Sequence, residues 1–148
     1  MSVDTMAQEM NLLYDVNKEN LISIACYTGD GELVEAVPLS AEKTGLDVTR
    51  QQWFTKAVNQ MENFHFSTPH VQNLFDDPSY RYYWVISLSR AVELTTNGSA
   101  KLGVLLVDMN YSSMEQLLEI ANTGTDSEYL YLMDADGEII YHPKQKLI

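Results

Sequence analysis

The chain is short of basic residues and of long apolar runs. Its 148 residues include 9 Lys and Arg against 21 Asp and Glu, which gives a formal net charge of −12. A surface of this sign repels phosphate backbones and anionic headgroups, so we expect no nucleic-acid partner. No stretch approaches the roughly 20 apolar residues of a membrane-spanning helix, and the N-terminus lacks the basic-then-apolar order of a signal peptide.

Cysteine and the common catalytic motifs are also scarce. The single cysteine, Cys26, cannot form an internal disulfide, and its apolar neighbours predict a small buried side chain. His65, His70 and His142 lack the close pairing with carboxylates or cysteine that zinc sites use. No nucleophile elbow, phosphate loop or dinucleotide fingerprint is present. We therefore expect no metal, no cofactor and no enzyme activity in this chain.

The first half of the sequence alternates between helical and strand patterns. Apolar positions at helical spacing predict one helix over Val3–Asn17 and another over Val48–Met61. Between them, the β-rich runs 21–27 and 33–37 flank the residues 28–32, where Asp-Gly is a strong hairpin signal. This order predicts a helix, a hairpin and a crossover helix.

The second half is dominated by strands. Tyr82–Leu94 and Lys101–Asn110 predict a long hairpin, preceded by a short strand over Phe64–Pro69. Ser112–Glu115 has the spacing of a capping box and opens a helix that stops near Asn122. Helix, hairpin, helix, three consecutive strands and helix together predict an α+β, PAS-like fold, with a central antiparallel sheet flanked by helices.

The end of the sequence repeats the turn pattern of the first hairpin. Gly31 and Gly137 each lie in an Asp-Gly-Glu turn between β-rich runs, separated by about the length of a small domain. We interpret residues 1–125 as one unit and residues 126–148 as the start of a second, truncated unit. The chain is then expected to be a piece of a longer protein.

Two charged residues lie on strand faces whose other residues are apolar and are therefore expected in the core. Arg90 alternates with apolar residues of the strand 82–94, and Asp108 with those of the strand 101–110. An unpaired buried charge is strongly destabilising. Three alternatives follow: the two residues pair with each other, they meet a ligand, or both lie near strand ends and reach solvent.

A second candidate group lies on the predicted crossover helix. Arg50, Trp53 and Phe54 fall within one turn. A guanidinium can hold a carboxylate through two parallel hydrogen bonds, and aromatic rings line small-molecule pockets. The alternative is that both aromatic residues belong to the core and that Arg50 is solvated.

Four segments in this order resemble the double Cache family of extracytoplasmic sensor domains. They are Arg50–Ala57, Phe66–Val71, Val85–Val92 and Leu102–Met109, and the resemblance extends over essentially the whole chain. It implies a long N-terminal helix and a membrane-distal, PAS-like module over 1–125 that binds a small ligand. Residues 126–148 then begin a membrane-proximal module.

The resemblance also assigns roles to particular residues. In the amino-acid-binding branch, an Arg-x-Trp-Tyr motif holds the ligand carboxylate, and an Asp at the end of the last strand binds the ammonium group. Trp53 and Phe54 match the aromatic pair, and Asp108 matches that Asp. Arg50 stands one residue farther away than in the motif, and His70 replaces the Tyr of a Tyr-x-Asp. These departures argue against an α-amino acid and leave a small polar metabolite as the implied ligand. Its candidate contacts are Arg50, Trp53, Phe54, His70, Arg90 and Asp108.

Residues 67–75 and 85–90 are also similar to the sensor regions of membrane histidine kinases of Gram-positive bacteria. This resemblance implies the extracytoplasmic part of a membrane-anchored, homodimeric two-component receptor whose kinase domain lies beyond Ile148. The alternatives are the sensor domain of a chemoreceptor or of a cyclic-dinucleotide enzyme. A module that dimerises through the helix 3–17 and senses a partner protein, with no small ligand, is a further alternative.

Overall fold

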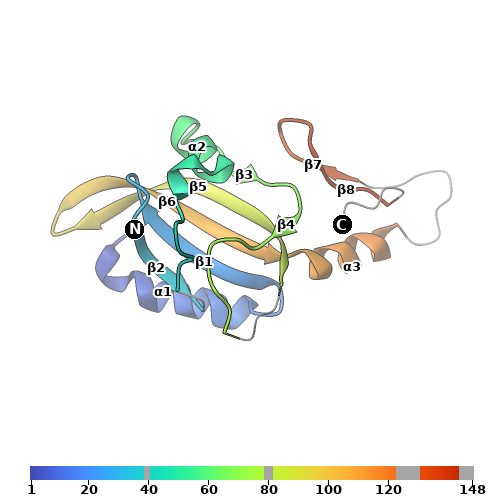
Figure 1. Ribbon diagram of the computed structural model, residues 1–148, viewed down its shortest axis with the longest axis horizontal. Coiled ribbons are helices and arrows are strands. Elements are labelled where there is room, and N and C mark those ends of the chain that lie inside the picture. The colour runs from blue at the N-terminus through green and yellow to red at the C-terminus, as the bar shows by residue number, and fades with distance from the viewer. Residues whose placement is uncertain (39–40, 79–81, 123–130, 144–148) are drawn as a thin grey trace.

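The computed structural model describes residues 1–38, 41–78, 82–122 and 131–143. Its elements are α1 (Val3–Asn17), β1 (Leu21–Thr28), β2 (Leu33–Val37), the 3-10 helix η1 (Val48–Arg50), α2 (Gln52–Asn59), β3 (His65–Phe66), β4 (His70–Val71), β5 (Trp84–Thr96), β6 (Ser99–Asn110), α3 (Tyr111–Ala121), β7 (Leu132–Met133) and β8 (Ile139–Tyr141). A six-stranded antiparallel sheet runs in the order β2-β1-β6-β5-β3, with β4 also paired to β5 (Figure 1). The predicted α+β fold with a long N-terminal helix is confirmed.

One face of the sheet is covered by α1. Met6 and Met10 point inward from the helix and are 1% and 2% exposed. They pack on apolar side chains of β1, β2 and β5, namely Ile24, Cys26, Val37 and Leu94. The predicted burial of Cys26 is therefore confirmed, and this face carries an apolar core.

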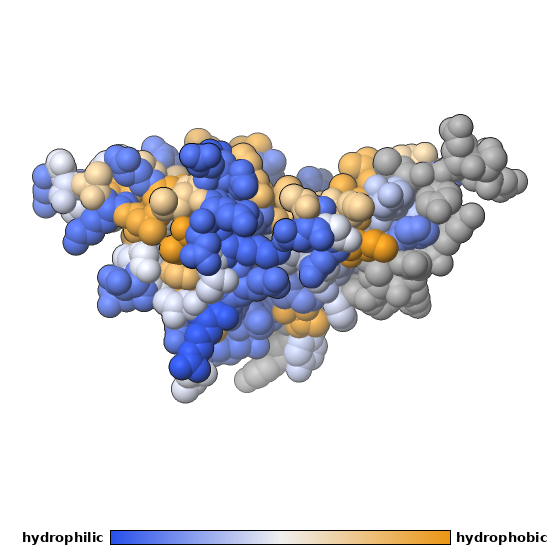
Figure 2. Space-filling model, turned by 90° about the horizontal axis from the view of Figure 1, so that it is seen from above, coloured by the Kyte–Doolittle hydropathy of each residue, from blue (hydrophilic) through white to orange (hydrophobic). Residues whose placement is uncertain are grey.

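The other face is covered by α2 and by the segment around Leu74 and Phe75. Alternation along β1 and β6 directs Ala25, Tyr27 and Leu106 to this side, where they meet the helix. The remaining buried members of the cluster are Ala36, Val48, Trp53, Phe54, Ala57 and Val104. Seen from the α2 side, the surface is largely hydrophilic, with apolar residues gathered in small groups (Figure 2).

Strand register decides which face each charged residue occupies. Asp108 pairs with Ser87 on β5 and with Ser23 on β1, whereas Arg90 pairs with Leu105. Directly opposed residues share a face, and Leu105 and Asp108 lie an odd number of positions apart. Asp108 therefore faces α2, and Arg90 projects from the other face of the sheet.

The predicted helix over Val48–Met61 is broken in the structure. Asp47 accepts hydrogen bonds from the backbone N–H of Thr49 at 3.1 Å and from its hydroxyl at 2.5 Å, and it caps the start of the 3-10 helix η1. Gln51 is extended, with φ −79° and ψ 144°, and α2 begins only at Gln52. The helical periodicity is real from Gln52 to Asn59, but η1 is a separate element.

The predicted capping box at the start of α3 is also wrong. Asn110 is the N-cap, and its side-chain oxygen accepts from the N–H of Ser112 at 3.0 Å. The Ser113 hydroxyl instead donates to the carbonyl of Glu19 at 3.1 Å, and the N–H of Asn110 donates to the carbonyl of Asn20 at 2.8 Å. These bonds tie the beginning of α3 to the segment that follows α1.

The C-terminal hairpin is a separate two-stranded sheet of β7 and β8. Its turn repeats that of the first hairpin: Gly31 and Gly137 have φ values of 88° and 85°, and Thr28 bonds to Glu32 as Asp134 bonds to Glu138. Ile140 and Tyr141 are 1% and 3% exposed. The expected boundary between residues 125 and 126 lies outside the described residues. Within the described part of the chain, no helix is long and apolar enough to cross a membrane.

Candidate ligand-binding site

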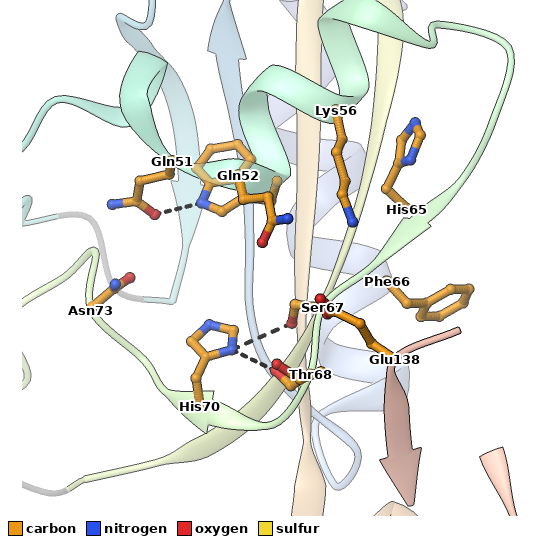
Figure 3. A pocket seen from close by; sticks show the side chains of 11 residues that line it. Gln51, Gln52, Lys56, His65, Phe66, Ser67, Thr68, His70, Asn73 and Glu138 are labelled. Atoms are coloured by element: carbon orange, nitrogen blue, oxygen red, sulfur yellow. Dashed lines mark hydrogen bonds between the residues drawn. The ribbon is translucent and has the colours of Figure 1, made fainter. Parts of the chain in front are cut away.

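A pocket of about 330 Å³ opens beside α2 on the polar side of the sheet (Figure 3). Three parts of the chain line it: Gln51, Gln52, Trp53 and Lys56 at α2; His65, Phe66, Ser67, Thr68, His70 and Asn73 in the segment with β3 and β4; and Glu138 of the C-terminal hairpin. Amide, hydroxyl and imidazole groups surround aromatic rings. This volume and mixture suit a small polar molecule.

Trp53 forms the aromatic wall of the pocket. Its ring centroid lies 5.5 Å from that of Tyr27 and 5.7 Å from that of Phe54, and its side chain is 9% exposed. The indole N–H donates to the side-chain oxygen of Gln51 at 2.6 Å, so the ring is fixed in place. Phe54, which the sequence paired with Trp53, lies behind it in the core and does not line the pocket.

Arg50 lies outside the pocket. Its side chain is 87% exposed, and its Nε is 3.5 Å from the Asp47 carboxylate. The break between η1 and α2 separates Arg50 from the helix that carries Trp53. The structure therefore does not bring this guanidinium beside the aromatic wall.

Arg90 is also outside the pocket. Its guanidinium carbon lies 4.3 Å from the ring centroid of Phe64, a cation–π contact at the edge of the sheet. Because Arg90 and Asp108 face opposite sides of the sheet, they do not pair with each other.

Asp108 is 1% exposed and lies beneath the pocket wall. Its Oδ1 accepts a 2.5 Å hydrogen bond from the Ser87 hydroxyl, whose oxygen is also 3.3 Å from Nε2 of His70. Burial raises the pKa of Asp108 to about 6, while the Ser87 hydrogen bond and the His70 charge act in the opposite direction. Asp108 therefore reaches the pocket through Ser87 and His70, and it is not itself part of the lining.

His70 is the pocket member of this chain of contacts. Its Nδ1 is 2.9 Å from the carbonyl of Thr68 and 3.3 Å from the hydroxyl of Ser67 (Figure 3). A carbonyl oxygen only accepts, so Nδ1 carries a hydrogen. With Nε2 facing Ser87, both ring nitrogens contact the protein, and the imidazole is held as part of the wall.

The order of these groups does not suit nucleophilic catalysis. In a catalytic triad the histidine stands between the serine and the carboxylate. Here Ser87 stands between His70 and Asp108, its hydroxyl donates a hydrogen bond to the carboxylate, and the residue is only 1% exposed. Among the described residues, no group of three His, Cys, Asp or Glu side chains could hold a metal ion.

The hydroxyl of Tyr27, whose ring contacts Trp53, is a further buried polar group on this side of the sheet, although Tyr27 does not line the pocket. It is buried and has no hydrogen-bond partner among the described residues. Burial, followed by the nearby carboxylates of Glu42 and Asp108, raises the pKa of Tyr27 well above its usual value. An unpaired buried hydroxyl is unfavourable, so this position is suited to a buried water molecule.

Sequence reasoning missed several of these groups. Gln72 is 6% exposed; its side-chain oxygen accepts from the N–H groups of Leu74 and Phe75, and its amide donates to the Phe75 carbonyl. It therefore holds the loop rather than a ligand. The sequence did contain one signal of this polar network, namely the two serines Ser87 and Ser89 on a long strand. A polar side chain on a buried face needs a hydrogen-bond partner.

Comparison with known proteins adds the fold relationship. No family model and no curated protein matches the sequence significantly. Among solved structures, the chain resembles the ligand-binding domain of the Pseudomonas fluorescens chemoreceptor CtaA with L-serine, with a TM-score of 0.61 and 18% identity, over 91% of this chain and 54% of that one. It also resembles the ligand-binding domain of the Pseudomonas aeruginosa amino-acid chemoreceptor PctC with GABA, with a TM-score of 0.60 and 21% identity, over 95% of this chain and 57% of that one. A third similar structure is the sensory domain of the Campylobacter jejuni chemoreceptor Tlp3 with isoleucine, with a TM-score of 0.59 and 15% identity, over 94% of this chain and 50% of that one.

These likenesses show the fold. The chain has the α+β architecture of Cache-type ligand-binding domains, as the sequence resemblance implied. It spans about half the length of the solved domains that it matches.

Proposed function

We propose that this chain is the non-catalytic, ligand-sensing part of a bacterial extracytoplasmic receptor, and that it binds a small polar metabolite in the pocket beside α2. The observation that carries the proposal is the pocket itself, where a fixed indole stands among amide, hydroxyl and imidazole groups. The solved chemoreceptor domains are in complex with L-serine, GABA and isoleucine, which are small molecules that carry a carboxylate and an ammonium group, and this supports the proposal.

Four of the six candidate contacts have a role in this proposal. Trp53 is the aromatic wall, Phe54 supports it from behind, and His70 closes the opposite side. Asp108 lies behind Ser87 and His70, and its carboxylate places negative charge near the pocket, which favours a ligand with a positively charged group such as ammonium. Arg50 and Arg90 have no role in it, because neither lines the pocket.

The test is a binding screen of the purified chain by thermal shift and calorimetry, with amino acids, carboxylates, amines, nucleobases and sugars. A ligand that binds only the folded state raises Tm by mass action. Gln52→Ala and Asn73→Ala should each weaken binding of any hit by about two- to tenfold, the value of one hydrogen bond. Asn59→Ala, at an exposed position of the same helix but outside the lining, is the matched control. Equal affinity in all three variants would place the ligand elsewhere.

The output of the receptor is a finer part of the proposal. The sequence resemblance favours a homodimeric, membrane-anchored histidine kinase with 1–125 as its membrane-distal module, whereas the solved neighbours favour a chemoreceptor. The gene sequence beyond Ile148 distinguishes the two. A histidine-containing dimerisation helix and an ATP-binding domain would support the kinase; a long cytoplasmic coiled coil would support the chemoreceptor.

A second candidate function is partner sensing through α1. Leu12, Leu13 and Val16 are 67%, 55% and 75% exposed on this helix, an apolar group that suits association. Sedimentation of the wild type and of Leu13→Glu tests it. If the wild type is dimeric and the variant monomeric, α1 is an interface; a wild type that stays monomeric at high concentration contradicts it.

A further inference from the structure

Lys56 is the one Lys or Arg among the described residues that lines the pocket, and it already binds a carboxylate. Its Nζ lies 2.7 Å from Oδ2 of Asp136, which is 80 residues away in the sequence. Figure 3 shows the Lys56 side chain extending from α2 into the pocket. The side chain of Lys56 is 23% exposed and that of Asp136 is 61% exposed, so solvent reaches the pair mainly from the hairpin side.

The turn of the C-terminal hairpin presents this carboxylate. Asp134 accepts hydrogen bonds from the N–H groups of Asp136 and Glu138, both at 2.9 Å, so the turn is held by its own contacts. At the other end of the hairpin, Ile140 is buried against Ile86 and Tyr111. One end of the hairpin is therefore fixed by apolar packing, and the turn is joined to α2 by an exposed ion pair.

We infer that Lys56 is a carboxylate-binding position of the pocket and that Asp136 occupies it as an internal substitute, so that a ligand carboxylate displaces the hairpin turn. This inference rests on the proposed ligand-binding function. A ligand carboxylate at Nζ of Lys56 would share this nitrogen with Asp136, which is 2.7 Å from it, and would also face Glu138 in the same lining. Like charges this close repel each other, so the ligand carboxylate and Asp136 compete for Lys56.

Two observations make the exchange feasible. The ion pair is exposed on the Asp136 side, and exposed ion pairs contribute little to stability. The neighbouring side chains Gln52, Ser67 and Thr68 line the same pocket and can donate hydrogen bonds to a second acid oxygen. The Asp136 hydrogen bond raises the pKa of Lys56, and the Lys56 hydrogen bond lowers the pKa of Asp136, so both groups are charged at neutral pH.

The consequence is a coupling between the pocket and the hairpin. A carboxylate ligand would release the turn while Ile140 stays packed, so the hairpin would pivot about its apolar end. A ligand with different affinity for the attached and released arrangements shifts the population between them.

The experiment uses the full chain with Trp84→Phe, which leaves Trp53 as the single tryptophan and makes its fluorescence a report on the pocket. Sodium propionate and its neutral counterpart propionamide are the probes, with sodium chloride holding ionic strength constant. Hydrogen exchange of residues 131–143 reports on the turn. We expect propionate to quench Trp53 fluorescence and to accelerate exchange at Asp136 and Glu138, and propionamide to do neither.

Three variants isolate the contact. Asp136→Asn removes the substitute and should tighten propionate binding by about two- to fivefold, the range of an exposed ion pair. Lys56→Gln should abolish propionate binding and accelerate exchange of the turn without any ligand. Asp30→Asn, in the equivalent turn of the first hairpin, is the matched control and should change neither quantity.

Two results overturn the inference and leave the proposed function standing. One is propionate binding that Asp136→Asn does not tighten or that leaves exchange of the turn unchanged. The other is failure of propionate to bind the wild type and Asp136→Asn while amines or neutral metabolites from the screen do bind. Failure of every probe and metabolite with the folded chain overturns the proposed function as well.

Discussion

The two faces of the sheet are built from the same strands but with different chemistry. The α1 face is packed with apolar side chains, among them Met6 and Met10 of the helix. The α2 side contains the buried polar side chains of the described chain, which are Ser23, Gln72, Ser87, Ser89 and Asp108. A buried polar group destabilises the fold when it lacks a partner, as the Tyr27 hydroxyl does among the described residues. The α1 face therefore depends on apolar packing, and the α2 face depends on hydrogen bonds that also provide the polar environment of the pocket.

The sharpest test of this comparison is a cavity on the α1 face. Met10→Ala removes a side chain that is 2% exposed, and we expect a loss of about 2–5 kcal/mol in the free energy of unfolding. Urea denaturation followed by circular dichroism measures it. Ligand binding at the pocket should be unchanged at temperatures where the variant is folded; a weakened affinity there would contradict the separation of the two faces.

The next test is the pH dependence of stability on the α2 face. Burial raises the pKa of Asp108 to about 6 from its ordinary 3.8, so the folded state binds this proton more tightly than the unfolded state. The free energy of unfolding should therefore fall as pH rises from about 4 to about 6, by on the order of 2–3 kcal/mol. The measurement is chemical denaturation across this range.

Asp108→Asn is the variant that isolates the titration. It should lose this pH dependence, because the amide does not titrate, whereas Met10→Ala should keep it. His70 faces the same network, so His70→Asn should be measured alongside. A pH profile that is identical in wild type and Asp108→Asn would show that this carboxyl is not the titrating group.

A smaller effect is expected from a single polar contact on the α2 face. The Ser89 hydroxyl donates to the Trp53 carbonyl at 2.9 Å, and Ser89 is fully buried. Ser89→Ala should cost about 1 kcal/mol in stability. It should also weaken binding of any identified ligand, because the contact positions the residue that forms the pocket wall. Unchanged affinity would mean that α2 does not depend on this bond for its position.

The smallest effect is expected from Arg90, which projects from the opposite face. Arg90→Gln loses one cation–π contact with Phe64, which is worth about 0.5–1 kcal/mol at exposed sites. Ligand affinity should be the same as in the wild type. A clear loss of affinity would show that this residue reaches the site after all and would remove the distinction between the faces.

Local pattern was sufficient for most of the fold. The helix over Val3–Asn17 and the strand over Leu33–Val37 have the predicted bounds, and the two long strands differ from prediction by two residues at one end or at both ends. In these segments the period of the apolar residues and the nearby turn signals agree. The short strand expected over Phe64–Pro69 is reduced to the two residues of β3, and β4 (His70–Val71), which was not predicted, follows it and pairs with a different part of β5.

The site was less predictable because its contacts join distant residues. Helical spacing placed Arg50 beside Trp53, but the extended backbone of Gln51 ends η1 before α2 begins. Ser87 meets Asp108 only through the register of β5 and β6. Lys56 meets Asp136 only through the packing of the C-terminal hairpin. None of these three outcomes has a signature in the sequence around a single residue.

The position of β1 in the sheet has a consequence for how the protein is made. β1 pairs with β6, so Leu21 meets Met109 and Thr28 meets Gly103, whereas β5 and β6 pair across a tight turn. At synthesis rates of about 5–20 residues per second, β1 leaves the ribosome roughly 4–16 seconds before β6 is complete. Until then, the apolar strand has only β2 as a partner. The nascent chain therefore exposes a strand edge that chaperones can bind, and the sheet closes only when the β5–β6 hairpin adds to it.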